Sequence, residues 1–299
     1  MNITVTGASG LIGRRLVKNL AGAGHRITVL SRHAGGKVPA NVRVVQWNPM
    51  TDAAPEDGLR GAEAVIHLAG EPVAQRWNER AKRRIRESRV VGTGHLVEAM
   101  AGLRNAPQTL VCASAVGYYG SRGEEELRED AAPGTGYLPE VCTAWEQEAE
   151  RAEALGVRVV RVRIGVVLDT GGGALGQMLM PFRMGVGGRL GDGNQWMSWI
   201  HLHDLAALFQ FAVEHPVSGP LNGVAPAPVT NAEFTRALAR ALQRPAVLPV
   251  PALALKLLFG EMSEVLLASQ KVLPAAALAA GFQFRFPELG AALENLLAE

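Results

Sequence analysis

The chain contains very little cysteine, no long apolar run and almost no excess charge. Cys112 and Cys142 are the only cysteines among its 299 residues, so there is no disulfide framework and a reducing compartment is favoured. The longest apolar candidate, residues 246–260, is interrupted by two prolines and by Lys256, which excludes a membrane-spanning helix there. The formal net charge of +2 gives no indication of nucleic-acid or membrane binding. Because the sequence opens directly on an apolar strand, we expect a cytoplasmic protein without a secretion segment.

Short β-branched runs alternate with helical patterns up to about residue 165. This alternation is typical of a parallel sheet that is covered by helices on both faces. Strands are expected at Asn2–Thr6, Ile27–Leu30, Val42–Gln46, Ala64–Leu68, Thr109–Ala113 and Val157–Ile164. Helices are expected at Leu11–Ala23, Asn78–Leu103 and Glu140–Leu155. We therefore predict an α/β fold, a Rossmann-type doubly wound parallel sheet, with residues 1–165 as the nucleotide-binding domain.

The pattern loosens after residue 165, where glycines and prolines become frequent. Helices are still expected at His203–Glu214, Asn231–Leu242 and Leu253–Leu267, with Asn231 as the N-cap of its helix. Residues 166–299 are predicted to form a smaller C-terminal substrate lobe that packs against the first domain. Some of these later segments can also complete the core of the first domain.

The strongest local signal is the glycine-rich segment Thr6-Gly7-Ala8-Ser9-Gly10-Leu11-Ile12-Gly13, between an apolar strand and an amphipathic helix. Gly7 permits a sharp turn, Gly10 lets backbone N–H groups approach a pyrophosphate, and Gly13 permits close packing of helix and strand. The helix N-terminus adds unpaired donors and partial positive charge. An ordinary glycine turn is the alternative, but the strand and helix around the motif favour dinucleotide binding.

The end of the second strand indicates which dinucleotide is bound. An NAD site usually has an acidic residue there, about 20 residues after the glycines, to accept from the ribose 2′-OH. This strand instead ends in Ser31 and Arg32, a hydroxyl and a planar donor fork that suit a 2′-phosphate. We therefore predict NADP(H) as the cofactor, with a solvated surface arginine as the alternative reading.

These residues resemble the extended short-chain dehydrogenase/reductase superfamily. The segment His67-Leu68-Ala69-Gly70 resembles the superfamily's cofactor-lining Asn-Ala-Gly segment, which implies cofactor contacts for Leu68, Ala69 and Gly70. Ser114-Ala115-Val116-Gly117-Tyr118-Tyr119-Gly120 resembles the strand end of nucleotide-sugar epimerases, which implies that Ser114 also lies near the cofactor.

More narrowly, the chain resembles the branch named epimerase family proteins. The residues that carry this likeness are Ser114–Gly120, Val141–Glu146, Gly193–His201, Gly260–Met262 and Ala280–Phe282. The resemblance covers essentially the whole chain. It implies a sugar-nucleotide epimerase-like protein that carries this branch's C-terminal domain.

The superfamily's Tyr-x-x-x-Lys pair is missing. In that pair the lysine lowers the tyrosine pKa and orients the cofactor ribose, and the tyrosine moves the proton. Counting from Tyr137 places Val141 at the lysine position, whereas anchoring on Glu146 places Leu138 and Cys142 at the two catalytic positions. The usual serine or threonine position falls near Ser114 or Ala115, with alanine as the favoured occupant. The standard acid–base relay is therefore absent.

Other groups are candidates to replace this relay. Tyr118 and Tyr119 follow the fifth strand, and ligands of open parallel sheets bind at the carboxyl ends of strands. Tyr118 and Ser114 are the candidate catalytic residues, although a packing role is favoured for the tyrosines. For Cys142, a buried inert thiol is favoured over a nucleophile. His201 and His203 have no third ligand at metal-site spacing, so no metal is assigned.

A second polar group is expected to bind the substrate. Gln195 and Ser198 offer hydrogen bonds and Trp196 a stacking surface, with packing between the lobes as the alternative for Trp196. Trp199 is expected in the core, and Asp204 is expected to cap the helix that it opens. The basic run from Arg76 to Arg89 is interpreted as a solvated helix face, because Trp77, Ala81 and Ile85 form an apolar stripe. Arg89 is the exception, because it falls at a position where relatives often have an asparagine near the active site. We expect it to point towards an anionic substrate.

Together these features predict an NADP(H)-dependent oxidoreductase or nucleotide-sugar epimerase-like enzyme. Its substrate would be a small polar molecule, with a nucleotide sugar as one candidate, and it would be a monomer or homodimer without nucleic-acid or membrane partners. The missing catalytic pair supports a rival interpretation, a non-catalytic NADP(H)-binding sensor or scaffold. A nucleic-acid-binding module is disfavoured by the near-neutral charge.

Overall fold

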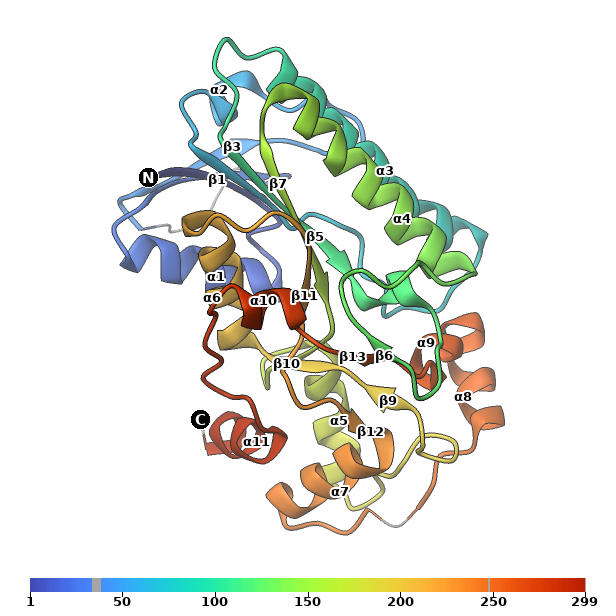
Figure 1. The fold of residues 1–299 in the computed structure, drawn as a ribbon. Helices are drawn as coiled ribbons and strands as arrows, with labels where there is room; N and C mark the ends of the chain where they lie inside the picture. The colour runs from blue at the N-terminus through green and yellow to red at the C-terminus, as the bar shows by residue number, and fades with distance from the viewer. Residues whose placement is uncertain (34–38, 247, 299) are drawn as a thin grey trace.

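A computed structural model describes residues 1–33, 39–246 and 248–298. Its centre is one parallel sheet with the strand order β11-β7-β5-β4-β1-β2-β3 (Figure 1). The strands are β1 (Asn2–Thr6), β2 (Arg26–Ser31), β3 (Val42–Gln46), β4 (Ala64–His67), β5 (Thr109–Ala115), β7 (Arg158–Ile164) and β11 (Gly219–Gly223). Strand order reverses between β1 and β4, which is the switch point of a doubly wound sheet. The predicted α/β Rossmann-type architecture is confirmed.

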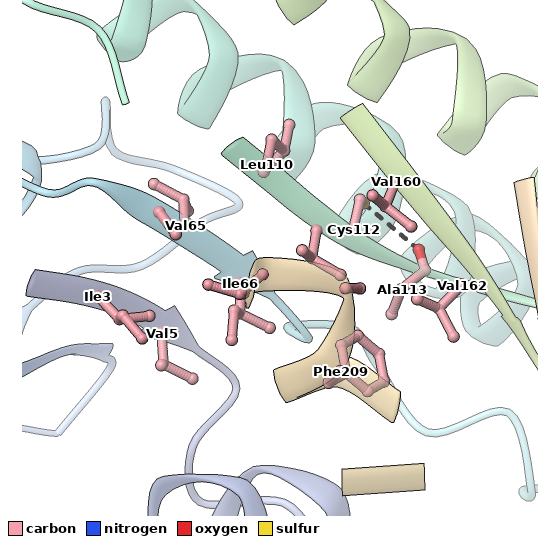
Figure 2. Packing of buried hydrophobic residues seen from close by; sticks show 14 of the residues in the cluster. Ile3, Val5, Val65, Ile66, Leu110, Cys112, Ala113, Val160, Val162 and Phe209 are labelled. Carbon is pink, nitrogen blue, oxygen red and sulfur yellow. Dashed lines mark hydrogen bonds between the residues drawn. The ribbon is translucent and has the colours of Figure 1, made fainter. Parts of the chain in front are cut away.

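Helices cover both faces of this sheet. The helices on its two faces and at its edge are α1 (Leu11–Gly22), α2 (Glu56–Leu59), α3 (Glu79–Ala101), α4 (Tyr137–Glu150) and α6 (Leu202–Glu214). Helix α3 packs against α4 on one face, and α1 packs against α6 on the other (Figure 1). Because both faces are covered, the residues of the central strands β1, β4 and β5 are almost all buried. Figure 2 shows Phe209 of α6 packed among side chains of the central strands.

The smaller lobe is built from the later part of the chain. Its helices are α5 (Gly173–Arg183), α7 (Asn231–Leu242), α8 (Ala252–Phe259), α9 (Ser263–Leu267) and α11 (Leu289–Ala298), whereas α10 (Ala275–Ala279) packs against β11 of the main sheet. Short two-stranded ladders pair β8 (Val166–Leu168) with β10 (Trp199–His201), β9 (Trp196–Met197) with β12 (Val229–Thr230), and β6 (Glu126–Leu127) with β13 (Lys271–Val272). The helices α5, α7 and α11 enclose a second apolar core that contains Trp199, which is fully buried as expected.

The main sheet does not end at residue 165. Strand β11 pairs with β7 from Gly219↔Val160 to Gly223↔Ile164, and α6 supplies part of the core beneath the sheet. Later segments therefore complete the first domain, while the division at residue 165 itself stays a prediction. No helix of the described part of the chain combines the length and apolarity needed to cross a bilayer.

Two expected helices differ from the structure in their extent. The helix expected at Leu253–Leu267 is broken by a 3-10 turn at Gly260–Met262, because Gly260 has a φ of +61°. The helix expected at Glu140–Leu155 begins earlier, at Tyr137, and its last residues, Arg151–Leu155, form a 3-10 helix. Gly156, with a φ of +76°, then ends it.

Candidate functional site

The glycine turn after β1 is shaped by close backbone contacts. Gly7 has a φ of +68°, and a Cβ there would lie 2.6 Å from the carbonyl carbon of Leu68. A Cβ on Gly13 would lie 2.3 Å from the Gly7 carbonyl oxygen. Both positions therefore require glycine, one for conformation and both for space. The turn holds β1, α1 and the end of β4 in contact.

The N-terminus of α1 has unsatisfied donors at this turn. Gly10 is its N-cap, no side chain caps the helix, and its first turn contains no acidic residue. Leu11, Ile12 and Gly13 form that first turn, so their N–H groups and the helix dipole are available to an anion. Arg14 lies one step further and donates to the Ser9 carbonyl at 2.8 Å, which adds positive charge beside the turn.

A buried pair joins β1 to β4 below the turn. The Thr6 hydroxyl lies 2.8 Å from Nδ1 of His67 and accepts from the N–H groups of Leu68 and Ala69 at 3.1 and 3.2 Å. Burial, together with the positive charge of Arg89, lowers the pKa of His67 to about 4. This neutral imidazole and the threonine position the segment that was expected to line the cofactor.

The carboxyl ends of four strands surround one cleft. Its volume is about 280 Å³, and it is lined by Gly7–Gly10, Leu30–His33, Trp47–Met50, Leu68–Pro72 and Ser88. A larger hollow of about 800 Å³ lies over the amino-terminal parts of β1, β2 and β3. Ligands of open parallel sheets bind at the carboxyl ends, so the smaller cleft is the candidate site.

The structure brings together most of the residues expected to bind the cofactor. Gly7, Ser9, Gly10, Ser31, Arg32, Leu68, Ala69 and Gly70 all line the cleft. Arg32 is exposed and forms no ion pair with the described residues. Its donor fork therefore remains available to a ligand. Ser31 accepts from the His33 N–H at 3.3 Å.

Sequence reasoning missed the wall formed by residues after β3. Asn48, Pro49 and Met50 line the cleft, and Trp47 lies beneath them with its indole N–H on the Asp52 carbonyl at 2.9 Å. These residues carry no recognisable motif. Their position directly after a strand of the parallel sheet was the one signal that pointed to them.

Ser114, expected to serve both cofactor and catalysis, is withdrawn from the cleft. It is 2 % exposed and donates to Oε1 of Glu146 at 2.6 Å. The Nε and Nη2 atoms of Arg163 donate to the same carboxylate at 2.9 Å each. Burial disfavours the charge of Arg163, but the hydrogen bonds and charge of Glu146 raise the pKa of the guanidinium above its ordinary value. The hydroxyl of Ser114 thus belongs to a buried ion-pair network, and its position does not support a catalytic role.

The two neighbouring tyrosines lie on a 3-10 turn, Val116–Tyr119, directly after β5. The Tyr118 ring, which is half-buried, stacks on the Arg163 guanidinium at 3.5 Å. Tyr119 is fully buried and donates to Oδ1 of Asn222 at 2.7 Å, while burial raises its pKa to about 12 although Arg163 opposes this shift. Of the two, Tyr118 is the one with access to solvent, and its catalytic role stays a prediction.

The start of α4 shows what occupies the positions of the missing catalytic pair. Tyr137 points to α3, donating to the Lys82 carbonyl at 2.6 Å and packing edge-on against Trp77. Leu138 and Cys142 instead face Gly117, where a Cβ would lie 3.4 Å from Leu138 and 3.8 Å from the Cys142 sulfur. The two residues that a count from Glu146 places at the catalytic positions, Leu138 and Cys142, therefore face the end of β5. Burial and Glu146 raise the pKa of Cys142 to about 12, which suits an inert thiol.

Arg89 points inward from α3, unlike most of the basic run. Trp77, Ala81 and Ile85 are buried as expected, and Arg76, Arg80, Arg83, Arg84 and Arg86 are exposed. Arg89 is half-buried, and its guanidinium lies 5.0 Å from the Trp145 ring. Its Nη1 atom donates to the Glu71 and Ile85 carbonyls at 2.9 and 3.0 Å.

Two residues expected to bind the substrate, Gln195 and Ser198, are hydrogen-bonded to the segment of residues 266–272. Ser198 donates to the Gln270 carbonyl at 2.6 Å and accepts from the Val272 N–H at 2.8 Å. Gln195 is 7 % exposed and donates to the Leu190 and Leu266 carbonyls. These buried contacts brace the C-terminal segment and do not support substrate binding by either residue.

Trp196 differs from these two residues because it is half-buried. Its indole N–H donates to Glu124 at 2.7 Å, and the Lys271 ammonium lies 4.8 Å from its ring. The same region clasps the turn after β5, since the Gln270 amide donates to the Val116 and Gly120 carbonyls at 2.9 and 3.0 Å. Trp196 thus lies at the junction of the two lobes, and a stacking role for it stays a prediction.

Two expected helix caps are wrong. The N-cap of α7 is Thr230, which forms a capping box with Glu233, whereas Asn231 accepts from the Leu190 N–H at 2.7 Å. His201 caps α6 by accepting from the His203 N–H at 3.0 Å. Asp204 accepts instead from the N–H groups of Arg285 and Phe286. Within the described ranges, no group of three or more His, Cys, Asp or Glu side chains is arranged to hold a metal ion.

Comparison with known proteins places this architecture in a family. The model of the "NAD dependent epimerase/dehydratase family" matches residues 3–225, and that of a domain of unknown function, DUF1731, matches residues 250–296. An epimerase family protein of Mycobacterium bovis, Mb2239, is 42% identical over 294 residues, which cover 97% of this chain and 96% of that protein. The Bacillus subtilis epimerase family protein YfhF is 39% identical over 301 residues, covering 100% and 99%.

A solved structure agrees with these matches. The human epimerase family protein SDR39U1, crystallised with NADPH, superposes with a TM-score of 0.89 at 36% identity and covers 100% of both chains. The resemblance read from the sequence is confirmed. The chain therefore belongs to the NAD dependent epimerase/dehydratase family, in the branch of epimerase family proteins that carries the DUF1731 domain.

Proposed function

We propose that this protein binds NADP(H) in the cleft at the carboxyl ends of β1, β2, β3 and β4. The observation that carries the proposal is the uncapped N-terminus of α1 beside an arginine fork that has no carboxylate partner among the described residues. Glycine at positions 7 and 13 lets the turn pack tightly, because a Cβ at either position would meet backbone atoms of Leu68 or Gly7. The related human protein was crystallised with NADPH, which supports the same ligand here.

Different residues of the cleft would bind different parts of the cofactor. The N–H groups of Leu11, Ile12 and Gly13 would hold the pyrophosphate, since the Gly10 N–H already donates to the Gly7 carbonyl at 3.1 Å. Ser31 and Arg32 would hold the 2′-phosphate, because a guanidinium binds phosphate oxygens through two parallel donors. Asn48–Met50 would form the wall beside the adenosine. When bound, the cofactor supplies hydride chemistry at its nicotinamide.

We further propose an enzyme of oxidoreductase or nucleotide-sugar epimerase type that works on a small polar substrate. Tyr118 is the candidate proton donor because it is the accessible hydroxyl at the end of β5. Leu138 and Cys142 supply neither the hydroxyl nor the ammonium of the usual relay. This observation favours a second candidate function, a non-catalytic NADP(H)-binding sensor or scaffold.

Titration with NADPH and NADH tests the cofactor assignment. Arg32→Gln should weaken NADPH binding by about ten- to hundred-fold, the loss expected for a charge-assisted phosphate contact, and leave NADH unchanged. Arg80→Gln, which removes the same charge from an exposed position on α3, is the control. Equal affinities of the native protein for NADPH and NADH would contradict the assignment.

Turnover distinguishes the two candidate functions. Purified protein is incubated with NADPH and a panel of nucleotide sugars while absorbance loss and product isomers are followed. Turnover that Tyr118→Phe abolishes supports the enzyme. Tight NADPH binding without turnover across the panel supports the sensor.

A further inference from the structure

The strand order determines where the second half of a bound dinucleotide must lie. The candidate phosphate site lies at β1, and the 2′-phosphate and adenosine contacts lie at β2 and β3. The order β5-β4-β1-β2-β3 then leaves the ends of β4 and β5 for the nicotinamide and its ribose. In the superfamily, a lysine from the following helix approaches this ribose. Cys142 occupies that position here.

Arg89 places a fixed positive charge at the same strand ends. A Cβ on Gly70 would lie 3.2 Å from the guanidinium carbon of Arg89, and Gly70 lines the cleft after β4. On its other side, the guanidinium lies 5.0 Å from the ring of Trp145, on the helix α4 that carries Cys142. The guanidinium therefore lies between the lining of the cleft and the helix on which the superfamily places its lysine.

The arginine retains unused hydrogen-bonding capacity. Nη1 is held by two carbonyls, but Nε and Nη2 donate to no described residue. Arg89 also lacks an ion pair with any described carboxylate, since Glu71 is engaged by Arg84. These two donor atoms, Nε and Nη2, are therefore open to a ligand, and a guanidinium binds oxygen atoms through parallel N–H donors. Its contacts to Trp145 and to the two carbonyls keep it in place.

We propose that Arg89 binds the nicotinamide–ribose half of NADP(H) and takes over the ribose-holding role of the absent lysine. This inference rests on the proposed cofactor site. It assigns the cation to α3, whereas the superfamily places it on the next helix, and it makes Gly70 the residue that lets the guanidinium reach the cleft. Because an arginine cannot lose its proton near neutral pH, it orients the ribose without exchanging a proton.

Comparing the affinities of two ligands, only one of which contains the nicotinamide half, distinguishes a contact with that half from a general disruption of the cleft. NADPH contains both halves, whereas 2′,5′-ADP contains only the adenosine half with its phosphates. Arg89→Gln should weaken NADPH binding by about ten- to hundred-fold, the loss of one or two charge-assisted hydrogen bonds, and leave 2′,5′-ADP binding unchanged. Arg89→Lys, which keeps the charge, should recover part of the NADPH affinity.

Arg83→Gln is the matched control, because it removes an exposed arginine from the same helix. It should alter neither affinity. Unchanged NADPH binding in Arg89→Gln would overturn the proposal, as would an equal loss for both ligands, which would indicate an indirect effect on the cleft. If the native protein binds neither ligand, the proposed cofactor site fails first and this inference fails with it. Retained 2′,5′-ADP binding shows that each variant is folded.

Discussion

The hydroxyl of Ser114 donates a 2.6 Å hydrogen bond to the carboxylate of Glu146, at the position where a catalytic hydroxyl was expected. The same carboxylate pairs with the buried guanidinium of Arg163. Removing one member of a buried pair leaves the other charge uncompensated, which is more costly than losing the pair as a whole. A buried ion pair between α4 and β7 thus holds the end of β5.

Glu146→Gln should therefore lower the free energy of unfolding by about 3–5 kcal/mol, as measured by urea denaturation. Glu148→Gln is the control on the same helix, because Glu148 pairs with Arg151 on a more exposed face. It should cost at most about 1 kcal/mol. Equal losses in the two variants would contradict the central role given to Glu146.

The buried His67 makes stability depend on pH. Its pKa is lowered from an ordinary value of about 6.5 to about 4, so the unfolded chain binds the proton more tightly than the folded one. The stabilising contribution is complete above pH about 6.5 and is lost as the pH falls towards 4, by about 3 kcal/mol in total. Unfolding free energies measured across this window should fall with decreasing pH.

His67→Gln should remove most of this slope whatever its effect on absolute stability. His215→Gln, which changes an exposed histidine, is the control and should retain the slope. A slope that survives in His67→Gln would show that other groups cause the acid sensitivity.

The glycine turn provides a prediction with an internal control. Gly7→Ala should both destabilise the protein and abolish measurable NADPH binding, because Gly7 has a positive φ and a Cβ would meet the Leu68 backbone at 2.6 Å. Gly22 is the last residue of α1, and a Cβ there would have nothing within 4 Å, so Gly22→Ala is the control. It should be neutral or stabilise the fold by up to about 1 kcal/mol. The comparison needs only thermal denaturation and a cofactor titration.

Both cysteines should resist thiol reagents in the folded protein. Cys112 and Cys142 are buried, and burial raises the pKa of each thiol, so little thiolate forms near neutral pH. A colorimetric disulfide reagent should react slowly with the native chain and rapidly with both thiols in urea. Fast reaction at Cys142 without denaturant would instead support a nucleophile.

Residues that follow strand ends were the most predictable part of the site. The glycine turn, Ser31, Arg32 and Leu68–Gly70 all come directly after parallel strands, and the topology brings such positions together. Asn48–Met50 occupy an equivalent position, but no motif distinguishes them. The capping box of Thr230 and Glu233 was also readable from its spacing, and Asn231 was chosen wrongly because it is an equally good cap by residue type.

Strand β11 could not be found from periodicity or propensity. Its sequence, Gly219–Gly223, contains glycine, proline and asparagine, which are disfavoured in strands. It is tolerated because β11 is at the edge of the sheet, where a proline need not donate to a second neighbour. The structural use of Gln195 and Ser198 was equally hidden, because their partners lie about residue 270, far along the chain.

The hydrogen bonds from Gln270 to the turn after β5 affect the order in which parts of the chain can fold. The two hydrogen bonds span 154 and 150 positions of the chain, so closing them costs more chain entropy than forming the local βα units. The nucleotide-binding half can therefore assemble on the ribosome while the turn that carries Tyr118 waits for distant residues to be synthesised. The site that would first recognise the cofactor is built early, and the one that would act on a substrate is finished late.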